Sequence, residues 1–187
     1  VSLIRGNQLE RALDAMRTYE ARVPEEATEF WNLLGQVAWE LRDYGSAERG
    51  YQRFVKTPQA RVSDWSRLID LVRPQYPAQA ADLAMQAYRR FGAVDQLVLA
   101  LEVYGEIRDT PALSRILSGL NADALATAEQ DKRFLLIRAQ FNQGQKKTGL
   151  AWTDLRRALQ PFPQETDVVL ASLWFLIDTG RSDDLAP

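Results

Sequence analysis

Apolar residues recur along this chain at intervals of three and four, which is the spacing of one face of an α-helix. In the first such stretch, which opens at Asn7, the apolar face consists of Leu9, Ala12, Leu13, Met16 and Tyr19. The same spacing predicts further helices over residues 27–42, 46–54, 62–72, 78–91, 94–107, 110–119, 150–159 and 166–178, and one more within 121–142. The pattern therefore predicts an all-α protein.

Short segments of turn-forming residues separate the predicted helices. Gly45 supplies the backbone freedom for the first turn, and Ser46 and Ser63 are expected to cap the helices that they open. Thr110 is also an expected N-cap, because Pro111 directly after it suits the first helical position. These turns join consecutive helices into hairpins.

Two tryptophans, Trp31 and Trp65, begin two stretches of the same shape, 34 residues apart. The residues that repeat at this offset are Leu34 with Leu68, Ala47 with Ala81, Tyr51 with Met85, and Phe54 with Tyr88. The small residues of the first stretch, Gly35 and Ala47, allow two helix backbones to approach closely. A 34-residue helix-turn-helix is the unit of the tetratricopeptide (TPR) repeat, and the chain resembles TPR proteins, most clearly before about residue 92.

The resemblance implies an all-α, right-handed superhelical solenoid of antiparallel helix pairs, in which no unit buries its apolar face alone. We expect a single TPR-like segment over 1–187, with a partial repeat at 1–27, repeats at 28–61, 62–92, 93–125 and 126–163, and a partial repeat at 164–187. Because both ends fall inside a repeat, we expect the chain to be a fragment of a longer array with apolar faces at its ends.

Composition argues against several classes of function. The 23 basic and 25 acidic residues are interspersed, whereas nucleic-acid binding normally needs a basic stripe. The chain has no Cys and no His, which removes thiol, imidazole and most zinc chemistry. The longest apolar run, 168–177, is about half of what a membrane-spanning helix needs. We therefore expect no nucleic-acid partner, no cofactor, no metal and no membrane span in this segment.

Catalysis is not expected either. The near-paired carboxylates are Asp183 with Asp184, and Asp64 with Asp70, and the second pair lies off one helical face. No phosphate-binding loop or serine elbow is present. The run Lys146-Lys147 is interpreted as a solvated turn, with contact to a phosphate or an acidic partner as the alternative.

The TPR resemblance also implies where a partner would bind, since the first helix of each unit lines the concave wall. The positions that face inward in the family are Glu29, Asn32, Gln36, Trp39 and Glu40 in one unit, and Ser63, Ser66, Asp70, Arg73 and Pro74 in the next. The following unit has Val94, Leu97, Leu101 and Tyr104, which are too apolar to be left in water. The candidate partner-binding residues are Glu29, Asn32, Gln36, Trp39, Glu40, Ser66, Asp70, Arg73 and Tyr104.

This wall is polar with one large aromatic residue, so it suits a polar peptide surface or the face of a sugar. The alternative for Trp39 is packing against a neighbouring helix. The wall offers Arg73 but no lysine, so the clamp that some TPR proteins use for a peptide C-terminal carboxylate is not expected.

Residues 31–55 and 64–77 are further similar to the periplasmic TPR regions of Pel-type exopolysaccharide exporters of Gram-negative bacteria. This resemblance implies a non-catalytic scaffold in the periplasm, anchored in the outer membrane through a β-barrel elsewhere in the full-length protein. Its implied partner is a polysaccharide deacetylase or hydrolase, with contact to the polymer itself as a possibility. The alternatives are a cytosolic peptide-binding TPR adaptor and a helical accessory domain of a cell-wall enzyme.

Overall fold

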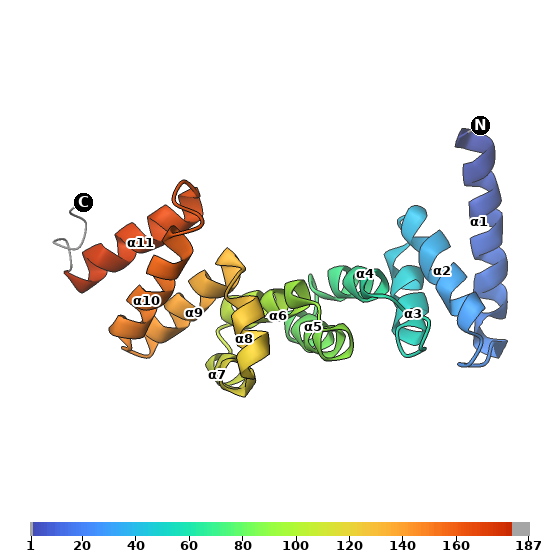
Figure 1. Cartoon of the computed structure of the whole chain (residues 1–187). Coiled ribbons are helices and arrows are strands. Elements are labelled where there is room, and N and C mark those ends of the chain that lie inside the picture. Colours follow the sequence, from blue (N-terminus) through green and yellow to red (C-terminus); the bar gives the residue numbers. More distant parts are fainter. Residues whose placement is uncertain (1, 181–187) are drawn as a thin grey trace. The chain divides into compact units, whose positions relative to one another are not determined.

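The computed structural model describes residues 2–180, and side chains from residue 6 onward. Every regular element in this part of the chain is a helix (Figure 1). The elements are α1 (Ser2–Tyr19), the 3₁₀ turn η1 (Glu20–Arg22), α2 (Thr28–Glu40), α3 (Tyr44–Phe54), α4 (Val62–Val72), α5 (Pro77–Phe91), α6 (Val94–Glu106), α7 (Thr110–Gly119), α8 (Ala122–Ala128), α9 (Lys132–Gly144), α10 (Thr148–Leu159) and α11 (Thr166–Thr179). The predicted all-α class is confirmed.

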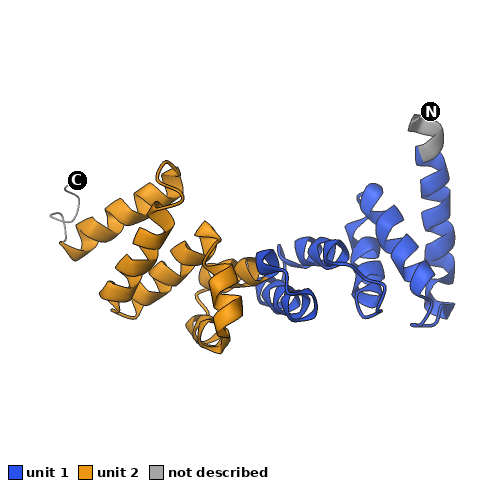
Figure 2. Cartoon of the chain, in the orientation of Figure 1, with its two compact units in different colours: residues 1–96 blue, residues 97–187 orange. Residues whose placement is uncertain are grey.

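The chain divides into two compact units, Val1–Gln96 and Leu97–Pro187 (Figure 2). In the first unit α1 contacts α2, α2 pairs with α3, α3 contacts α4, and α4 pairs with α5. In the second unit α9 pairs with α10, and α11 packs against both. In the first unit the α2–α3 pair packs against the α4–α5 pair through α3 and α4, and in the second the α9–α10 pair packs against α11, as neighbouring units of a TPR-like solenoid do.

The α2–α3 hairpin owes its close packing to two glycines. A Cβ atom added to Gly50 would lie 2.5 Å from the backbone nitrogen of Gly35 and 2.8 Å from its Cα. Around this crossing the rings of Trp31 and Tyr51 are fully buried. The Trp31 indole also donates a hydrogen bond of 2.9 Å to the carbonyl of Pro24, which ties the preceding loop to the hairpin.

The second unit packs its helices with alanines and one aromatic stack. Ala139 and Ala151 lie in a buried cluster with Leu155 and Phe175. The rings of Trp152 and Phe175 stack in parallel, with centroids 5.7 Å apart. Small and large buried side chains therefore fill this core together.

The turns differ from the prediction. Arg42, Arg108 and Lys146, with φ of 59°, 57° and 58°, take the left-handed conformation two residues before the first residue of α3, α7 and α10. Gly45, the predicted turn residue, lies inside α3. A non-glycine residue in this region is uncommon, and its recurrence at three hairpins shows one turn geometry used repeatedly.

The predicted helix caps were also misplaced. Asp43 rather than Ser46 caps α3, and its carboxylate accepts the Ser46 backbone N–H at 3.4 Å. Asp109 rather than Thr110 caps α7, accepting from the Ala112 N–H at 3.0 Å. The aspartate directly before each of these helices is in place to cap it, and its carboxylate also interacts favourably with the helix dipole.

At α4 the capping side chain comes from inside the helix. The Asp64 carboxylate accepts the backbone N–H of Arg61, the residue directly before the helix, at 2.9 Å. The hydroxyl of Ser63 is not the cap. Two helix assignments also differ from the structure. The first helix begins at Ser2 rather than Asn7, and the stretch 121–142 contains two helices, since Asp131 caps α9 and ends the continuity with α8.

Some predictions fall where the structure does not decide them. The helix α8 spans the proposed boundary between residues 125 and 126, so the division into individual repeats stays a prediction. Asp183 and Asp184 lie outside the described residues. Within those residues, none of the helices has the combination of length and hydropathy that crossing a bilayer requires.

Candidate partner-binding grooves

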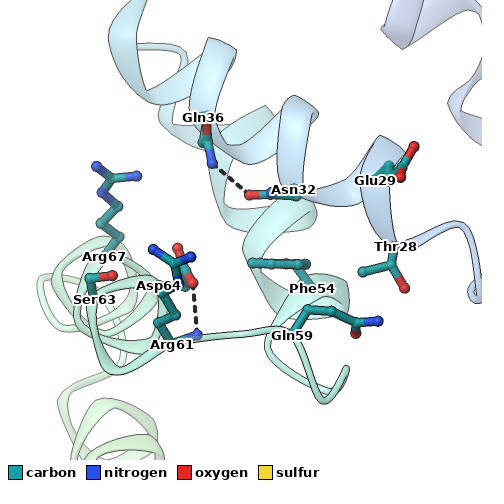
Figure 3. A pocket seen from close by; sticks show the side chains of 10 residues that line it. All are labelled: Thr28, Glu29, Asn32, Gln36, Phe54, Gln59, Arg61, Ser63, Asp64 and Arg67. Carbon is teal, nitrogen blue, oxygen red and sulfur yellow. Dashed lines mark hydrogen bonds between the residues drawn. The ribbon is translucent and has the colours of Figure 1, made fainter.

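A polar groove of about 470 Å³ lies between α2 and α4 in the first unit (Figure 3). Figure 3 shows α2 on one side of it and the start of α4 on the other. The side chains that line it are Thr28, Glu29, Asn32, Gln36, Phe54, Gln59, Arg61, Ser63, Asp64 and Arg67. Nine of these ten side chains carry a polar group, so the groove suits a ligand that forms hydrogen bonds.

Three of the predicted concave residues, Glu29, Asn32 and Gln36, line this groove together. They lie on one face of α2, and the Gln36 amide donates a hydrogen bond of 2.7 Å to the Asn32 side-chain oxygen. This bond orients both amides and leaves each with further donors and acceptors. The three side chains therefore lie on the α2 side of this groove, and their role in binding a partner stays a prediction.

Arg67 is the most firmly held cation of the groove. Its guanidinium donates a hydrogen bond of 2.7 Å to the Tyr51 hydroxyl and lies 5.9 Å from the centroid of the Trp39 ring. Burial raises the pKa of Tyr51, and the nearby Arg67 offsets this only in part, so the phenol stays protonated at neutral pH. The remaining guanidinium donors of Arg67 can therefore be offered to a ligand in a defined orientation.

The accessible charge of the groove is mixed. Asp64 is buried and its carboxylate accepts the Arg61 backbone N–H, so it acts mainly within α4. Glu29 is exposed, as is Arg61. The lining thus has one exposed carboxylate, that of Glu29, and two guanidinium groups, those of Arg61 and Arg67, so a ligand with a carboxylate side chain would find a partner there.

Trp39 is half-buried and does not line the groove. Its ring meets the Tyr44 ring edge-on, with centroids 6.2 Å apart, and the Arg67 guanidinium lies 5.9 Å from the centroid of the same ring. Packing within the first unit, the alternative interpretation of this residue, is therefore observed. Glu40 is exposed at the last position of α2, also outside the groove.

Of the positions predicted to face inward on the next first helix, Ser63 lines the groove with those on α2, whereas Ser66, Asp70 and Arg73 do not. The Ser66 hydroxyl donates to the Val62 carbonyl at 3.1 Å and accepts from the Gln96 amide at 3.1 Å. Burial raises the pKa of Asp70, while the positive charge of Arg73 lowers it in part. Ser66 thus holds helices together, and Asp70 and Arg73 form a separate charged pair farther along α4.

Tyr104 does not belong to an accessible wall. It is only 3% exposed, and Leu97 and Leu101 on the same helix are fully buried. The prediction that this apolar stretch packs against other side chains is confirmed, and the same burial removes Tyr104 from the exposed surface. Tyr104 was selected only by its position in the repeat, and this position does not determine how deeply other helices cover the side chain.

Sequence reasoning missed Arg61 and Arg67. Arg67 directly follows Ser66, which the TPR pattern marks as inward, and Arg61 lies just before α4, two residues before the inward position Ser63. Their long side chains reach the groove although their Cα positions lie outside the pattern. An arginine beside an inward position was the available signal.

The second unit has a groove of a different character between α9 and α11, with a volume of about 360 Å³. Leu136, Ile137 and Ala171 give it an apolar lining, and Trp174 on its edge is 63% exposed. Among the described residues no group of three or more Asp, Glu, His or Cys side chains is placed to hold a metal.

Consecutive helices that pack as pairs in both units define a helical-repeat protein with grooves between its helices. The family profile for the tetratricopeptide repeat matches residues 3–187, and the chain belongs to the TPR family. No curated protein matches the chain. The family indicates a scaffold for protein–protein interaction, and its repeats are generally non-catalytic.

Proposed function

We propose that this segment is a non-catalytic scaffold whose α2–α4 groove binds an extended polar segment of a partner protein. The observation that carries the proposal is the groove itself, in which α2 presents Asn32 and Gln36 opposite the fixed guanidinium of Arg67. Amide groups can pair with both donors and acceptors of a peptide backbone. The guanidinium supplies selectivity for a carboxylate on the bound segment.

The proposal extends to the biological setting. The similarity of residues 31–55 and 64–77 to the periplasmic repeats of the Pel exporter PelB supports a place in exopolysaccharide export and biofilm formation. In that setting the full-length protein is anchored in the outer membrane and the segment lies in the periplasm. It holds a polysaccharide deacetylase or hydrolase beside the export pore, where the polymer itself can touch the repeats.

The binding part of the proposal is tested with two matched variants of the native protein. Gln36→Arg places a longer, charged side chain in the groove, whereas Gln75→Arg makes the same change at an exposed turn between α4 and α5. Co-purification of the native partner should fall at least about tenfold for the first variant and stay unchanged for the second. Equal retention of the partner by both variants would show that the partner does not bind in the groove.

The biological setting has a separate test, which is the gene around this segment. A secretion signal upstream and strands of an outer-membrane pore downstream would support the exporter. A catalytic domain directly adjacent would support an accessory domain of a cell-wall enzyme. The identity of the co-purified partner distinguishes the same possibilities, since a deacetylase or hydrolase is expected.

A further inference from the structure

A second large groove, of about 520 Å³, lies in the second unit and is formed by α7, α8, α9 and α10. Its lining comprises Ser114, Leu117, Ser118, Leu125, Glu129, Arg138, Phe141, Asn142, Lys147, Leu150, Thr153, Asp154 and Arg157. It is distinct from the α2–α4 groove, because it lies in the other unit and two of its walls come from α7 and the short helix α8.

One part of this groove is apolar. Leu117, Leu125 and Phe141 contribute to it from three different helices, and Leu150 contributes from the first turn of α10. Leu150 is 56% exposed, which leaves much of a large aliphatic side chain in water. An apolar side chain of a ligand would cover this surface with a favourable loss of water contact.

The acidic groups of the groove are already satisfied within the protein. Asp154, only 4% exposed, accepts hydrogen bonds from Arg138 Nε at 3.0 Å and from the Asn142 amide at 3.2 Å. Glu129 accepts from Arg138 at 2.7 Å and from Arg157 at 2.6 Å. Burial lowers the pKa of Arg138, but the two carboxylates raise it more strongly, so this network stays charged and fixed.

The charge left for a ligand is positive. Lys147 is exposed, and among the described residues it has no carboxylate partner. Arg157 is half-exposed at 51% of its side chain and needs only part of its guanidinium for Glu129. With the two carboxylates engaged by Arg138 and Arg157, the accessible rim of the groove is cationic.

We infer that the α7–α10 groove binds an acidic amphipathic segment of a protein partner. A large apolar side chain of that segment lies over Leu150 and Phe141, and one of its carboxylates pairs with Lys147 at the rim. This inference rests on the proposed scaffold function. A free phosphate would need the cations but not the apolar surface, which is why the groove favours an amphipathic peptide.

The test uses the whole chain and three defined probes. The first is a fluorescein-labelled synthetic peptide of about fourteen residues with Leu at positions i, i+3, i+4 and i+7 and Glu between them. In the second peptide each Leu is replaced by Ser, and the third probe is inorganic phosphate as a competitor. Fluorescence anisotropy should show binding of the Leu peptide and much weaker binding of the Ser peptide, and phosphate should not displace the Leu peptide.

Four variants locate the binding. Lys147→Glu and Leu150→Asp should each weaken binding of the Leu peptide about tenfold. The matched controls Lys146→Glu and Leu173→Asp change exposed residues outside the groove and should leave the affinity unchanged. Circular dichroism checks that every variant keeps its helix content.

Three results would overturn the inference. These are equal weakening by Lys146→Glu and Lys147→Glu, undiminished binding by Leu150→Asp, and the absence of any binding of the Leu peptide. If Gln36→Arg still abolishes capture of the native partner, the scaffold proposal survives such a failure. If the Leu peptide does not bind and Gln36→Arg also leaves capture of the native partner unchanged, the scaffold proposal itself is contradicted.

Discussion

The crossing of α2 and α3 gives the sharpest test of how this fold is held together. In the variant Gly50→Ala the new methyl group would lie 2.5 Å and 2.8 Å from backbone atoms of Gly35, and 3.0 Å from the Trp31 carbonyl oxygen. Backbone atoms of a buried helix cannot rotate away as a flexible side chain can. The two helices must therefore move apart.

Two opposing effects set the size of the result. Alanine is favoured over glycine inside a helix by about 1 kcal/mol, whereas overpacking of a well-packed core costs about 1–3 kcal/mol, and more where backbone is involved. The contacts at Gly50 are at the severe end, so we expect a net destabilisation of about 2 kcal/mol. With a urea m-value of about 2 kcal/mol/M, the unfolding midpoint falls by about 1 M.

Gly45 provides a matched control in the same helix. A Cβ atom there would meet only side-chain atoms, at 3.8 Å and 3.9 Å, so Gly45→Ala should leave the midpoint unchanged or raise it. The assay is urea unfolding followed by circular dichroism, comparing midpoints, because repeat proteins can depart from two-state behaviour. If Gly50→Ala is as stable as the parent chain, the two helices do not cross as closely as described and the reasoning is refuted.

Three further predictions concern polar groups. Asp154→Ala should lower stability by about 3 kcal/mol, because it leaves a buried cation short of a partner, whereas replacing Asp154 by Leu together with Arg138 by Met should be nearly neutral; equal losses in urea unfolding would contradict this. Burial raises the pKa of Asp43, but its hydrogen bonds with Ser46 and Arg17 and the charge of Arg17 lower that pKa by more, so the net pKa is below its ordinary value. Its stabilisation is therefore present at neutral pH and lost as the pH falls through the folded pKa. Asp43→Ala should cost about 1 kcal/mol at pH 7, and thermal unfolding should show this difference shrinking below about pH 4; a constant difference would argue against the cap. Trp31→Phe should destabilise by about 1 kcal/mol more than Trp65→Phe, since only the Trp31 indole N–H has a hydrogen-bond partner, and equal melting temperatures would disprove it.

The fold class was predictable because its signals are local. The spacing of apolar residues and the 34-residue offset from Trp31 to Trp65 depend only on positions within one or two helices, and a stacked repeat buries the same positions each time. Gly35 was correctly singled out for close packing. Its partner Gly50 was not, because the atom that a glycine approaches depends on how two helices cross.

The errors at helix ends have a common cause. Asp43 and Asp109 each follow a residue in the left-handed conformation, and this turn moves the cap one or more residues earlier than Ser46 or Thr110. Hydroxyl and carboxylate residues were both available in these segments. Which one caps depends on the backbone path into the helix, which the residue types alone do not determine.

The candidate site was predicted only in part. Asn32 and Gln36 were found because they share one face of α2, which is a property of a single helix. Arg67 was missed because its place in the groove depends on its hydrogen bond to Tyr51, a residue on another helix. Tyr104 was wrongly placed on an exposed wall, since its burial depends on tertiary packing.

The central claim is that a partner protein lies in the α2–α4 groove, and site-specific photo-crosslinking in the native cell tests it most directly. A photoreactive phenylalanine is introduced at position 36, in the groove, and separately at position 75, in the exposed turn. We expect a single cross-linked protein from position 36, identified by mass spectrometry as a polysaccharide deacetylase or hydrolase, and none from position 75. Cross-links of equal yield from both positions, or from position 75 alone, would contradict it.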